Sequence, residues 1–263
     1  MSRRGPSTRQ FEGSDVYLAA AEAVTEAARI AEAETYLRRI RRFHPVPVGA
    51  RLLEVGVGTG WFLVYAAKQG LRCDGVEVNP VNARHADLLL AEHRVNASVQ
   101  VGSIEDAALP SESYDVVVAM SVFEHVRRHR DGLSNVYSAL RPGGVLYFYS
   151  TNKFSPKSGE YPMPLYGWLP NHARYRIRVW RQGPSIISSS GVDFHQFTYR
   201  GLRRTFREVG FSRVVDQYEM LDPADLGRPT QWKRALVAAA DRFPPFVGAL
   251  RTFAPGTCFI CVK

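Results

Sequence analysis

Short apolar runs alternate with helical stretches through the middle of the chain, from residue 48 to about residue 150. Each run is nearly continuous in apolar residues, as strands are when helices cover both faces of a parallel sheet. The expected strands cover residues 51–57, 73–78, 97–102, 114–120 and 144–150, and the expected helices cover residues 60–69, 82–94 and 131–140. This alternation predicts a doubly wound α/β domain.

The first 47 residues predict a polar tail followed by one long helix. Ser14 or Asp15 is the expected N-cap, and apolar residues at mostly helical spacing continue to Phe43. Pro45 and Pro47 then end the helix, because proline cannot continue it.

Two insertions are expected after the regular core, which covers residues 48–151. Residues 152–198 are irregular, aromatic and basic, and long connections of this kind tend to be lids or binding loops. Residues 199–263 return to the core, and residues 221–255 within them form the second insertion. In this part we expect a helix over 199–209, a strand over 212–220, a helix over 231–243 that Pro244 and Pro245 break, and a last strand over 257–263.

Composition is that of one globular domain, with 45% hydrophobic and 22% charged residues in 263. The basic, polar start argues against a secretory signal, and no run approaches the roughly 18 to 20 apolar residues that cross a bilayer. We therefore expect a cytoplasmic protein, whose contact with membranes could only be peripheral. Three cysteines give no disulfide framework, and Cys258 and Cys261 are expected to be buried and reduced.

The net charge of +9 is compatible with nucleic acid, an anionic membrane surface or a phosphorylated substrate. No compact basic stretch interleaved with aromatic residues is typical of an RNA-binding module. Nucleic acid is therefore not the expected partner, and the oligomeric state stays open.

Two features on consecutive predicted strands point to a bound nucleoside. Residues 54–60, EVGVGTG, lie where the first strand turns into the first helix, and glycines there let a ligand approach the backbone. Glu77 ends the next strand, where a carboxylate can accept hydrogen bonds from both ribose hydroxyls. A dinucleotide fingerprint would need a glycine in place of Trp61, so NAD and FAD are disfavoured.

The rest of the core strengthens this picture, because residues 48–156 resemble the class I S-adenosylmethionine-dependent methyltransferases. The matching segments are LLEVGVGTGWFLVYAA, VEVNP, VGSIEDAALPSESYDVVVAMSVFEHV and LRPGGVLYFYSTNKFSP. The tail from Tyr199 is similar to the closing helix and antiparallel strand pair of that family. The chain most resembles the ubiquinone-biosynthesis O-methyltransferase group in three motifs, SVFEHV, RPGG and FYSTNKF.

The resemblance implies a Rossmann-like, seven-stranded sheet whose last strand is antiparallel. It also implies S-adenosylmethionine as cofactor, S-adenosylhomocysteine as product, and a first helix that covers the cofactor cleft. The cofactor-binding residues that it implies are Glu54, Gly56, Gly58, Gly60, Glu77, Val78, Ser103, Ile104, Glu105 and Met120. Glu54 would lie near the methionine portion and Met120 near the sulfonium. Ile104 and Glu105 would border the adenine, while many relatives carry Asp in place of Ser103.

A general base and a metal are the remaining questions of chemistry. Some members of that group bind a divalent metal through an acidic residue and a Glu-His pair. Glu124 and His125 keep the pair, but Ser121 replaces the acid, so no metal is expected. A hydroxyl or amine acceptor must lose its proton, and the candidate catalytic bases are His125 and His195.

The insertions are the expected acceptor site. Aromatic residues of the first insertion could enclose an apolar or ring-shaped group, and its arginines could engage an anion. These residues are Tyr161, Tyr166, Trp168, Trp180, Arg174, Arg176 and Arg178. The alternative is an ordinary small core under a long loop. Apolar residues between 236 and 253 could likewise touch a lipid surface or pack against the sheet.

The expected function is therefore O-methylation of a small organic or lipid-linked acceptor, such as a natural product, a quinone precursor or a glycan. Methyl transfer to nitrogen or carbon stays open, because the cofactor motifs do not specify the acceptor atom. An RNA methyltransferase and a methyltransferase-like domain that binds without turnover are further alternatives.

Overall fold

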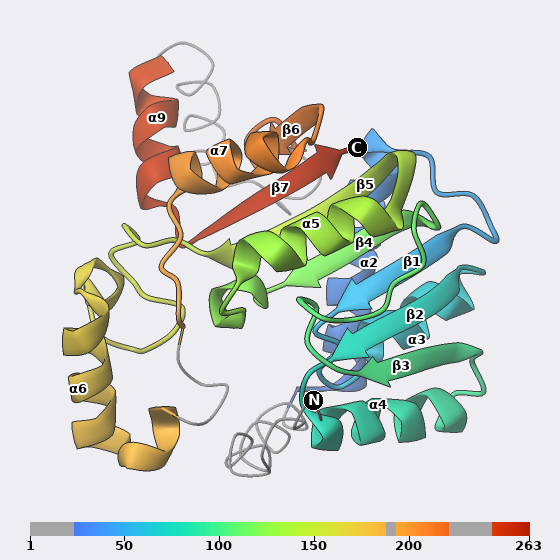
Figure 1. The fold of residues 1–263 in the computed structure, drawn as a ribbon, viewed down its shortest axis with the longest axis horizontal. Coiled ribbons are helices and arrows are strands. Elements are labelled where there is room, and N and C mark those ends of the chain that lie inside the picture. The colour runs from blue at the N-terminus through green and yellow to red at the C-terminus, as the bar shows by residue number, and fades with distance from the viewer. Residues whose placement is uncertain (1–23, 188–192, 221–243) are drawn as a thin grey trace, which may run out of the picture.

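The computed structural model describes residues 24–187, 193–220 and 244–263, and within them the chain forms a seven-stranded sheet (Figure 1). The strands are β1 (Arg51–Val55), β2 (Arg72–Glu77), β3 (Ala97–Val101), β4 (Tyr114–Met120), β5 (Leu140–Thr151), β6 (Arg213–Asp216) and β7 (Gly256–Val262). Their order is β3-β2-β1-β4-β5-β7-β6, and β7 runs antiparallel to both of its neighbours. The predicted α/β sheet with an antiparallel last strand is confirmed.

The order in which strands are added to the sheet reverses at β1, although β1 to β5 are all parallel. Strands β2 and β3 lie on one side of β1, and β4 and β5 lie on the other. Val55 pairs with Ala119, so the carboxyl ends of β1 and β4 lie side by side. In open α/β sheets, the crevice outside the carboxyl ends at such a reversal is the usual ligand position.

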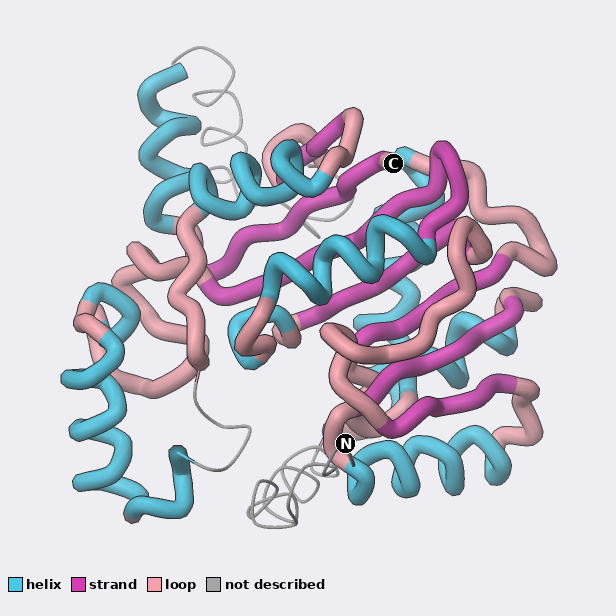
Figure 2. The backbone as a smooth tube through the Cα atoms, viewed as in Figure 1, coloured by secondary structure: helices cyan, strands magenta, loops and turns pink. Residues whose placement is uncertain are grey.

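Helices cover both faces of the sheet and form two cores (Figure 2). Behind the sheet in Figure 1 lie α2 (Glu26–Phe43) and α3 (Trp61–Lys68), and α4 (Pro80–Glu92) packs into the same core. In front lie α5 (His129–Ala139) and α7 (Tyr199–Val209). Buried apolar residues at helical spacing, such as Ala33, Leu37 and Ile40 of α2, explain why these segments fold as helices.

The first helix is shorter at its start than predicted. Thr25 is extended, and its hydroxyl accepts a hydrogen bond from the Ala28 N–H at 3.3 Å, so Thr25 is the N-cap of α2. An unbroken helix from residue 14 is therefore wrong, and the predicted caps Ser14 and Asp15 lie outside the described residues. The predicted end at Phe43 is confirmed.

The first insertion contains a helix that the sequence did not predict, α6 (Asn171–Gln182). Arginines alternate with apolar residues from 174 to 179, and this period of two hides the helical spacing. The helix buries Arg174 and Arg178, which are four residues apart, rather than an apolar face. In Figure 1, α6 lies beyond the carboxyl ends of the parallel strands.

Two further boundaries differ from the prediction. β6 ends at Asp216, because the Asp216 carboxylate accepts hydrogen bonds from the backbone N–H groups of Tyr218 and Glu219 and turns the chain. Pro244 begins α9 (Pro244–Phe253) instead of only breaking a helix, since the first turn of a helix needs no proline N–H. The helix predicted over residues 231–243 lies outside the described residues.

Candidate cofactor and acceptor site

A cavity of about 350 Å³ opens at the carboxyl ends of β1 and β4 and is closed on one side by α2. Four predicted cofactor-binding residues line it, namely Glu54, Gly56, Gly58 and Met120. The other lining residues are Arg29, Glu32, Ala33, Tyr36, Val57, Thr59, Trp61, Phe62, Ser121 and Tyr149. We call this space the β1–β4 cavity.

The glycine loop turns tightly at the mouth of this cavity. Gly56 has φ +74°, and a Cβ on it would come within 2.3 Å of the Val122 side chain. Gly60 has φ +90° and is the N-cap of α3. Side chains are excluded from both positions by backbone conformation, and from Gly56 also by packing. The loop backbone is therefore open to the cavity.

Glu77 fastens the glycine loop to the end of β2. Its Oε2 accepts a hydrogen bond from the Gly58 N–H and its Oε1 accepts one from the Asn79 N–H, both at 2.9 Å. Burial raises the pKa of Glu77, while these N–H groups act in the opposite direction. Each carboxylate oxygen keeps a second lone pair, so Glu77 can still accept hydrogen bonds from a ligand.

Glu54 has a carboxyl oxygen, Oε2, without a hydrogen-bond partner among the described residues at the cavity wall. Its side chain is buried. Burial, and then the charge of Glu77, raise the pKa of Glu54 well above its ordinary value. Buried carboxylates normally have partners, so this geometry indicates a place for a cationic or hydrogen-bond-donating group of a ligand.

Sequence reasoning missed the individual cavity residues of α2. Arg29, Glu32, Ala33 and Tyr36 line the cavity from one face of that helix. Their spacing of three or four residues was a usable signal, but the same spacing also describes ordinary packing.

Tyr149 was missed as a cavity residue, and Ser121 was considered only as the replacement of an acidic metal ligand. Ser121 has φ +54°, which is unusual outside glycine, and its N–H donates to the Tyr149 carbonyl at 2.9 Å. Strained residues of this kind gather at functional sites.

The remaining predicted cofactor residues do not line the β1–β4 cavity. Val78 follows β2 and is 41% exposed, whereas Ile104 is buried in the core. Glu105 accepts hydrogen bonds from the Ser103 hydroxyl at 2.8 Å and from the Arg128 N–H. Because β2 and β3 follow β1 in the sheet, these residues continue the same edge away from the cavity.

The two predicted bases have different surroundings. The Nδ1 atom of His125, in the short helix η2 (Phe123–His125), lies 3.7 Å from Oδ1 of Asp193, and the His125 side chain is 32% exposed. The Nε2 atom of His195 lies 3.0 Å from the Arg127 carbonyl oxygen, and its ring packs against His129. His125 therefore has a buried carboxylate beside it, and His195 does not.

Glu124 does not share an open site with His125. Its side chain is buried, and its carboxylate accepts a hydrogen bond from the Ser150 hydroxyl at 3.0 Å. Among the described residues, no group of three or more His, Cys, Asp or Glu side chains is placed to hold a metal ion.

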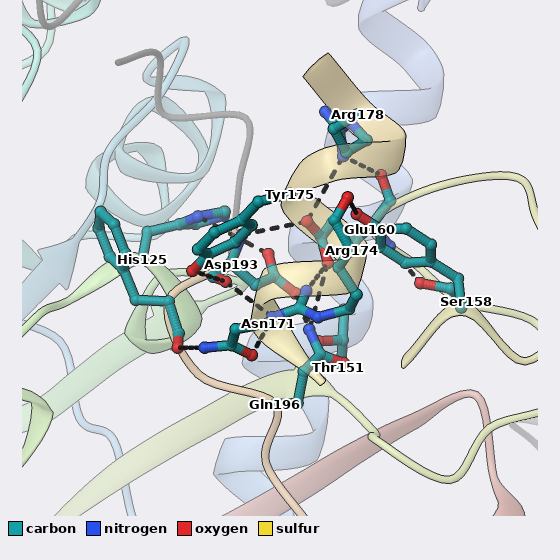
Figure 3. A network of polar contacts seen from close by, with 12 residues as sticks. His125, Thr151, Ser158, Glu160, Asn171, Arg174, Tyr175, Arg178, Asp193 and Gln196 are labelled. Carbon is teal, nitrogen blue, oxygen red and sulfur yellow. Dashed lines mark hydrogen bonds and ion pairs between the residues drawn. The ribbon is translucent and has the colours of Figure 1, made fainter. Parts of the chain in front are cut away.

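Asp193 belongs to a buried network of ionic and hydrogen-bonded groups (Figure 3). Arg174 is fully buried, forms an ion pair with Glu160, and donates to the Asp193 carbonyl at 3.1 Å. Gln196 donates to Oδ2 of Asp193 at 2.9 Å and to Glu160 at 3.2 Å. Burial is the largest cause that raises the pKa of Glu160, to about 7. The network fixes Asp193 between the insertion and the core.

The prediction that the insertion offers its arginines to a substrate anion is wrong for Arg174 and Arg178. Both are buried against Glu160, because a carboxylate inside the insertion needs cationic partners. Tyr166 is also fully buried, and its hydroxyl donates to the Arg174 carbonyl. Much of the predicted substrate surface is therefore the small core that the sequence left as the alternative, although Trp168 and Trp180 are exposed.

Other expectations concern cysteines and membranes. Cys258 and Cys261 are free and buried, as predicted, and so is Cys73. No helix in the described part of the chain is both long and apolar enough to span a bilayer.

Residues 27–217 match the methyltransferase domain family. The chain is 28% identical to the ubiquinone biosynthesis O-methyltransferase of Parvibaculum lavamentivorans, over 75% of both proteins. It is 30% identical to that of Mesorhizobium japonicum, over 64% of this chain and 73% of the relative. A 31% identical match to the Methylobacterium sp. protein covers 48% of this chain and 52% of the relative, so the chain spans about half the length of that protein.

Solved structures of methyltransferases share this fold. An S-adenosylmethionine-dependent methyltransferase from Mesorhizobium loti is 18% identical, with a TM-score of 0.55 over 83% of this chain and 94% of that chain. The Haemonchus contortus phosphoethanolamine N-methyltransferase 2, in complex with S-adenosylmethionine, is 17% identical, with a TM-score of 0.56 over 88% of this chain and 52% of that chain. The domain match, the sequence relatives and the fold together show that the chain belongs to the class I S-adenosylmethionine-dependent methyltransferases.

Proposed function

We propose that this enzyme methylates an oxygen atom of a small organic or lipid-linked acceptor. The observation that carries the proposal is the pairing of His125 with the buried Asp193. His125 follows the cavity-lining Ser121 by four residues. A hydroxyl acceptor must give up its proton, and an imidazole beside a carboxylate is suited to take it. The relatives named as O-methyltransferases support the same choice of acceptor atom.

The cofactor is proposed to extend along the sheet edge from β4 to β3. Glu54 would pair with the ammonium of its methionine portion, because a nearby cation stabilises the ionised form of a buried carboxyl whose Oε2 atom has no partner among the described residues. The backbone of Gly56, Gly58 and Gly60 would pass beside it, with Met120 near the sulfonium. Glu77 would hold the ribose, and the residues proposed around the ribose and adenine are Val78, Ser103, Ile104 and Glu105.

When bound, S-adenosylmethionine supplies a methyl group that its positive sulfur already activates for transfer. The task of the protein is to align the acceptor oxygen with that methyl group and to receive the hydroxyl proton. Asp193 would hold Nδ1 of His125, so that Nε2 accepts the proton. The acceptor oxygen would take the methyl group while the sulfur would keep the electron pair of the carbon–sulfur bond, and His125 would hold the proton that the hydroxyl gives up.

Substitution of His125 tests this proposal. We expect His125→Asn to lower the rate of methyl transfer by about 10²- to 10⁴-fold, the usual contribution of a general base. Affinity for S-adenosylmethionine should stay within about twofold, because the base binds the acceptor and not the donor. Labelled S-adenosylmethionine with a panel of phenols and lipid-linked glycans gives the rate, and mass spectrometry of the product locates the methyl group.

The matched control is His195→Asn, which removes the other predicted base. Equal losses in both variants would show that the imidazoles are structural. A methyl group found on nitrogen or carbon would overturn the assignment to oxygen, whatever the rates.

A further inference from the structure

Arginines form a stripe along one face of α7. Arg200, Arg203, Arg204 and Arg207 are spaced by three or four residues, opposite the buried face that carries Leu202 and Phe206. Like charges at this spacing repel one another and destabilise a helix. The stripe therefore does not arise from the stability of the helix itself.

The stripe faces a cavity of about 540 Å³ between α7 and α9, which we call the α7–α9 cavity. Besides the stripe, its lining residues are Tyr199, Glu208, Gly248, Arg251 and Thr252. It shares no lining residue with the β1–β4 cavity. Its volume lies within the range of small-molecule sites, roughly 300 to 1,000 Å³.

Three residues that line the α7–α9 cavity, Tyr199, Arg203 and Arg251, are held by polar contacts with one another and with Asp216. The Tyr199 hydroxyl donates to Asp216 at 2.6 Å and accepts from Arg203 at 3.0 Å. Arg251 pairs with the same carboxylate at 2.7 Å, with its guanidinium over the Tyr199 ring. These contacts hold two guanidinium groups in place before any ligand binds.

Among the described residues that line this cavity, positive charge exceeds negative charge. Within the described part of the chain, Arg200, Arg203 and Arg207 form no ion pair, whereas Arg204 pairs with Glu208. The Nε atoms of Arg203 and Arg251 are buried and have no hydrogen-bond partner among the described residues, so a ligand would bind the other guanidinium nitrogens. An anion there would balance the charge of the three arginines that form no ion pair.

We propose that the α7–α9 cavity is a binding site for a phosphate-bearing anion. Planar guanidinium groups that converge from two helices can bind the paired oxygens of carboxylate or phosphate, and several arginines without an ion pair favour phosphate, which carries the larger negative charge. Both a soluble phosphorylated molecule and a phospholipid headgroup carry this chemistry. The half-exposed Phe253, which follows Thr252 on α9, would be the apolar neighbour that a headgroup requires.

Calorimetric titration with inorganic diphosphate tests the soluble source of the anion. We expect saturable binding that Arg203→Gln/Arg207→Gln weakens by roughly tenfold or more for each arginine removed. A second variant, Gly248→Phe, should abolish binding, because Gly248 lines the cavity and a bulky side chain there would fill it. The fold should tolerate the change, since a Cβ at Gly248 would meet no atom within 4 Å. The control is Arg72→Gln/Arg176→Gln, which removes the same charge from two exposed positions elsewhere.

The lipid source has its own measurement, co-sedimentation with phosphatidylcholine vesicles that contain phosphatidylglycerol. Binding to vesicles alone, lost in the same variants, would identify a headgroup. No binding to either probe, or equal binding by the cavity and control variants, would overturn the site. S-adenosylmethionine affinity is measured on every variant, and we expect it unchanged, so a failure here is separate from any failure of the proposed methyl transfer.

Discussion

At the scale of single residues, the site is marked by the carboxyl group of Glu54, which has no cationic partner among the described residues. Glu54 is buried at the cavity wall with an unpartnered oxygen, whereas Glu77 has a backbone N–H on each oxygen. Both residues are acids at strand ends in the sequence. The difference in hydrogen bonding assigns them different tasks, and we expect Glu54 to depend on a ligand for its counter-charge.

The raised pKa of Glu54 leads to a pH-dependent affinity. A cationic ligand binds the ionised carboxylate, so below the Glu54 pKa binding must release a proton, and affinity should rise with pH until that pKa is passed. We expect S-adenosylmethionine to bind more tightly at about pH 7 than at about pH 5, because an ordinary carboxyl would already be ionised over most of that range. Calorimetry in buffers of different ionisation enthalpy measures both the affinity and the proton released.

Glu54→Gln is the control for this pH dependence. It should bind S-adenosylmethionine more weakly and with little change between those two pH values. A wild-type affinity that is flat with pH would argue against Glu54 as the partner of the ammonium.

At the scale of elements, α6 is held by charge pairs rather than by an apolar face. Arg174 is completely buried, and Glu160 and Asp193 lie on the segments before and after α6. Loss of one member leaves a buried charge with fewer partners, which costs more than the lost pair contributes. The helix and the carboxylate beside His125 therefore depend on the same network.

Arg174→Met should lower the free energy of unfolding by about 3 to 5 kcal/mol, or unfold the insertion locally, because Glu160 would keep only its longer ion pair with Arg178. Urea denaturation with hydrogen exchange measures both. Arg176→Gln on the exposed side of α6 is the control, with an expected change within about 0.5 kcal/mol. Two equally stable variants would show that the network carries little energy, and Arg174→Met/Glu160→Gln should recover part of the loss.

At the scale of the whole molecule, two apolar cores on opposite faces of the sheet support a polar edge where the strands end. Residues from α2, β1, α3, β4 and β5 meet in the β1–β4 cavity. A ligand there contacts elements far apart in the sequence, so its binding should stabilise the fold as a unit.

S-adenosylmethionine at about 100 times its dissociation constant should add roughly 2.7 kcal/mol to the stability of the fold. For a chain of this size we expect a rise in Tm of about 5 to 10 °C. Differential scanning calorimetry gives the shift, with NADH as the control ligand. An equal shift with NADH would indicate nonspecific stabilisation instead of recognition of the donor.

The sequence by itself determined the order of strands and helices in the core and the acids beside the glycine loop, and the resemblance to the class I methyltransferases implied the antiparallel last strand. The first two depend on local periodicity and on a motif whose residues are close along the chain. Only the tertiary structure decided that Arg174 and Arg178 face inward, that Asp193 lies beside His125, and that α7 and α9 enclose arginines. Such pairings join segments far apart in the chain. A charged residue reads as exposed in a sequence until the fold supplies its partner.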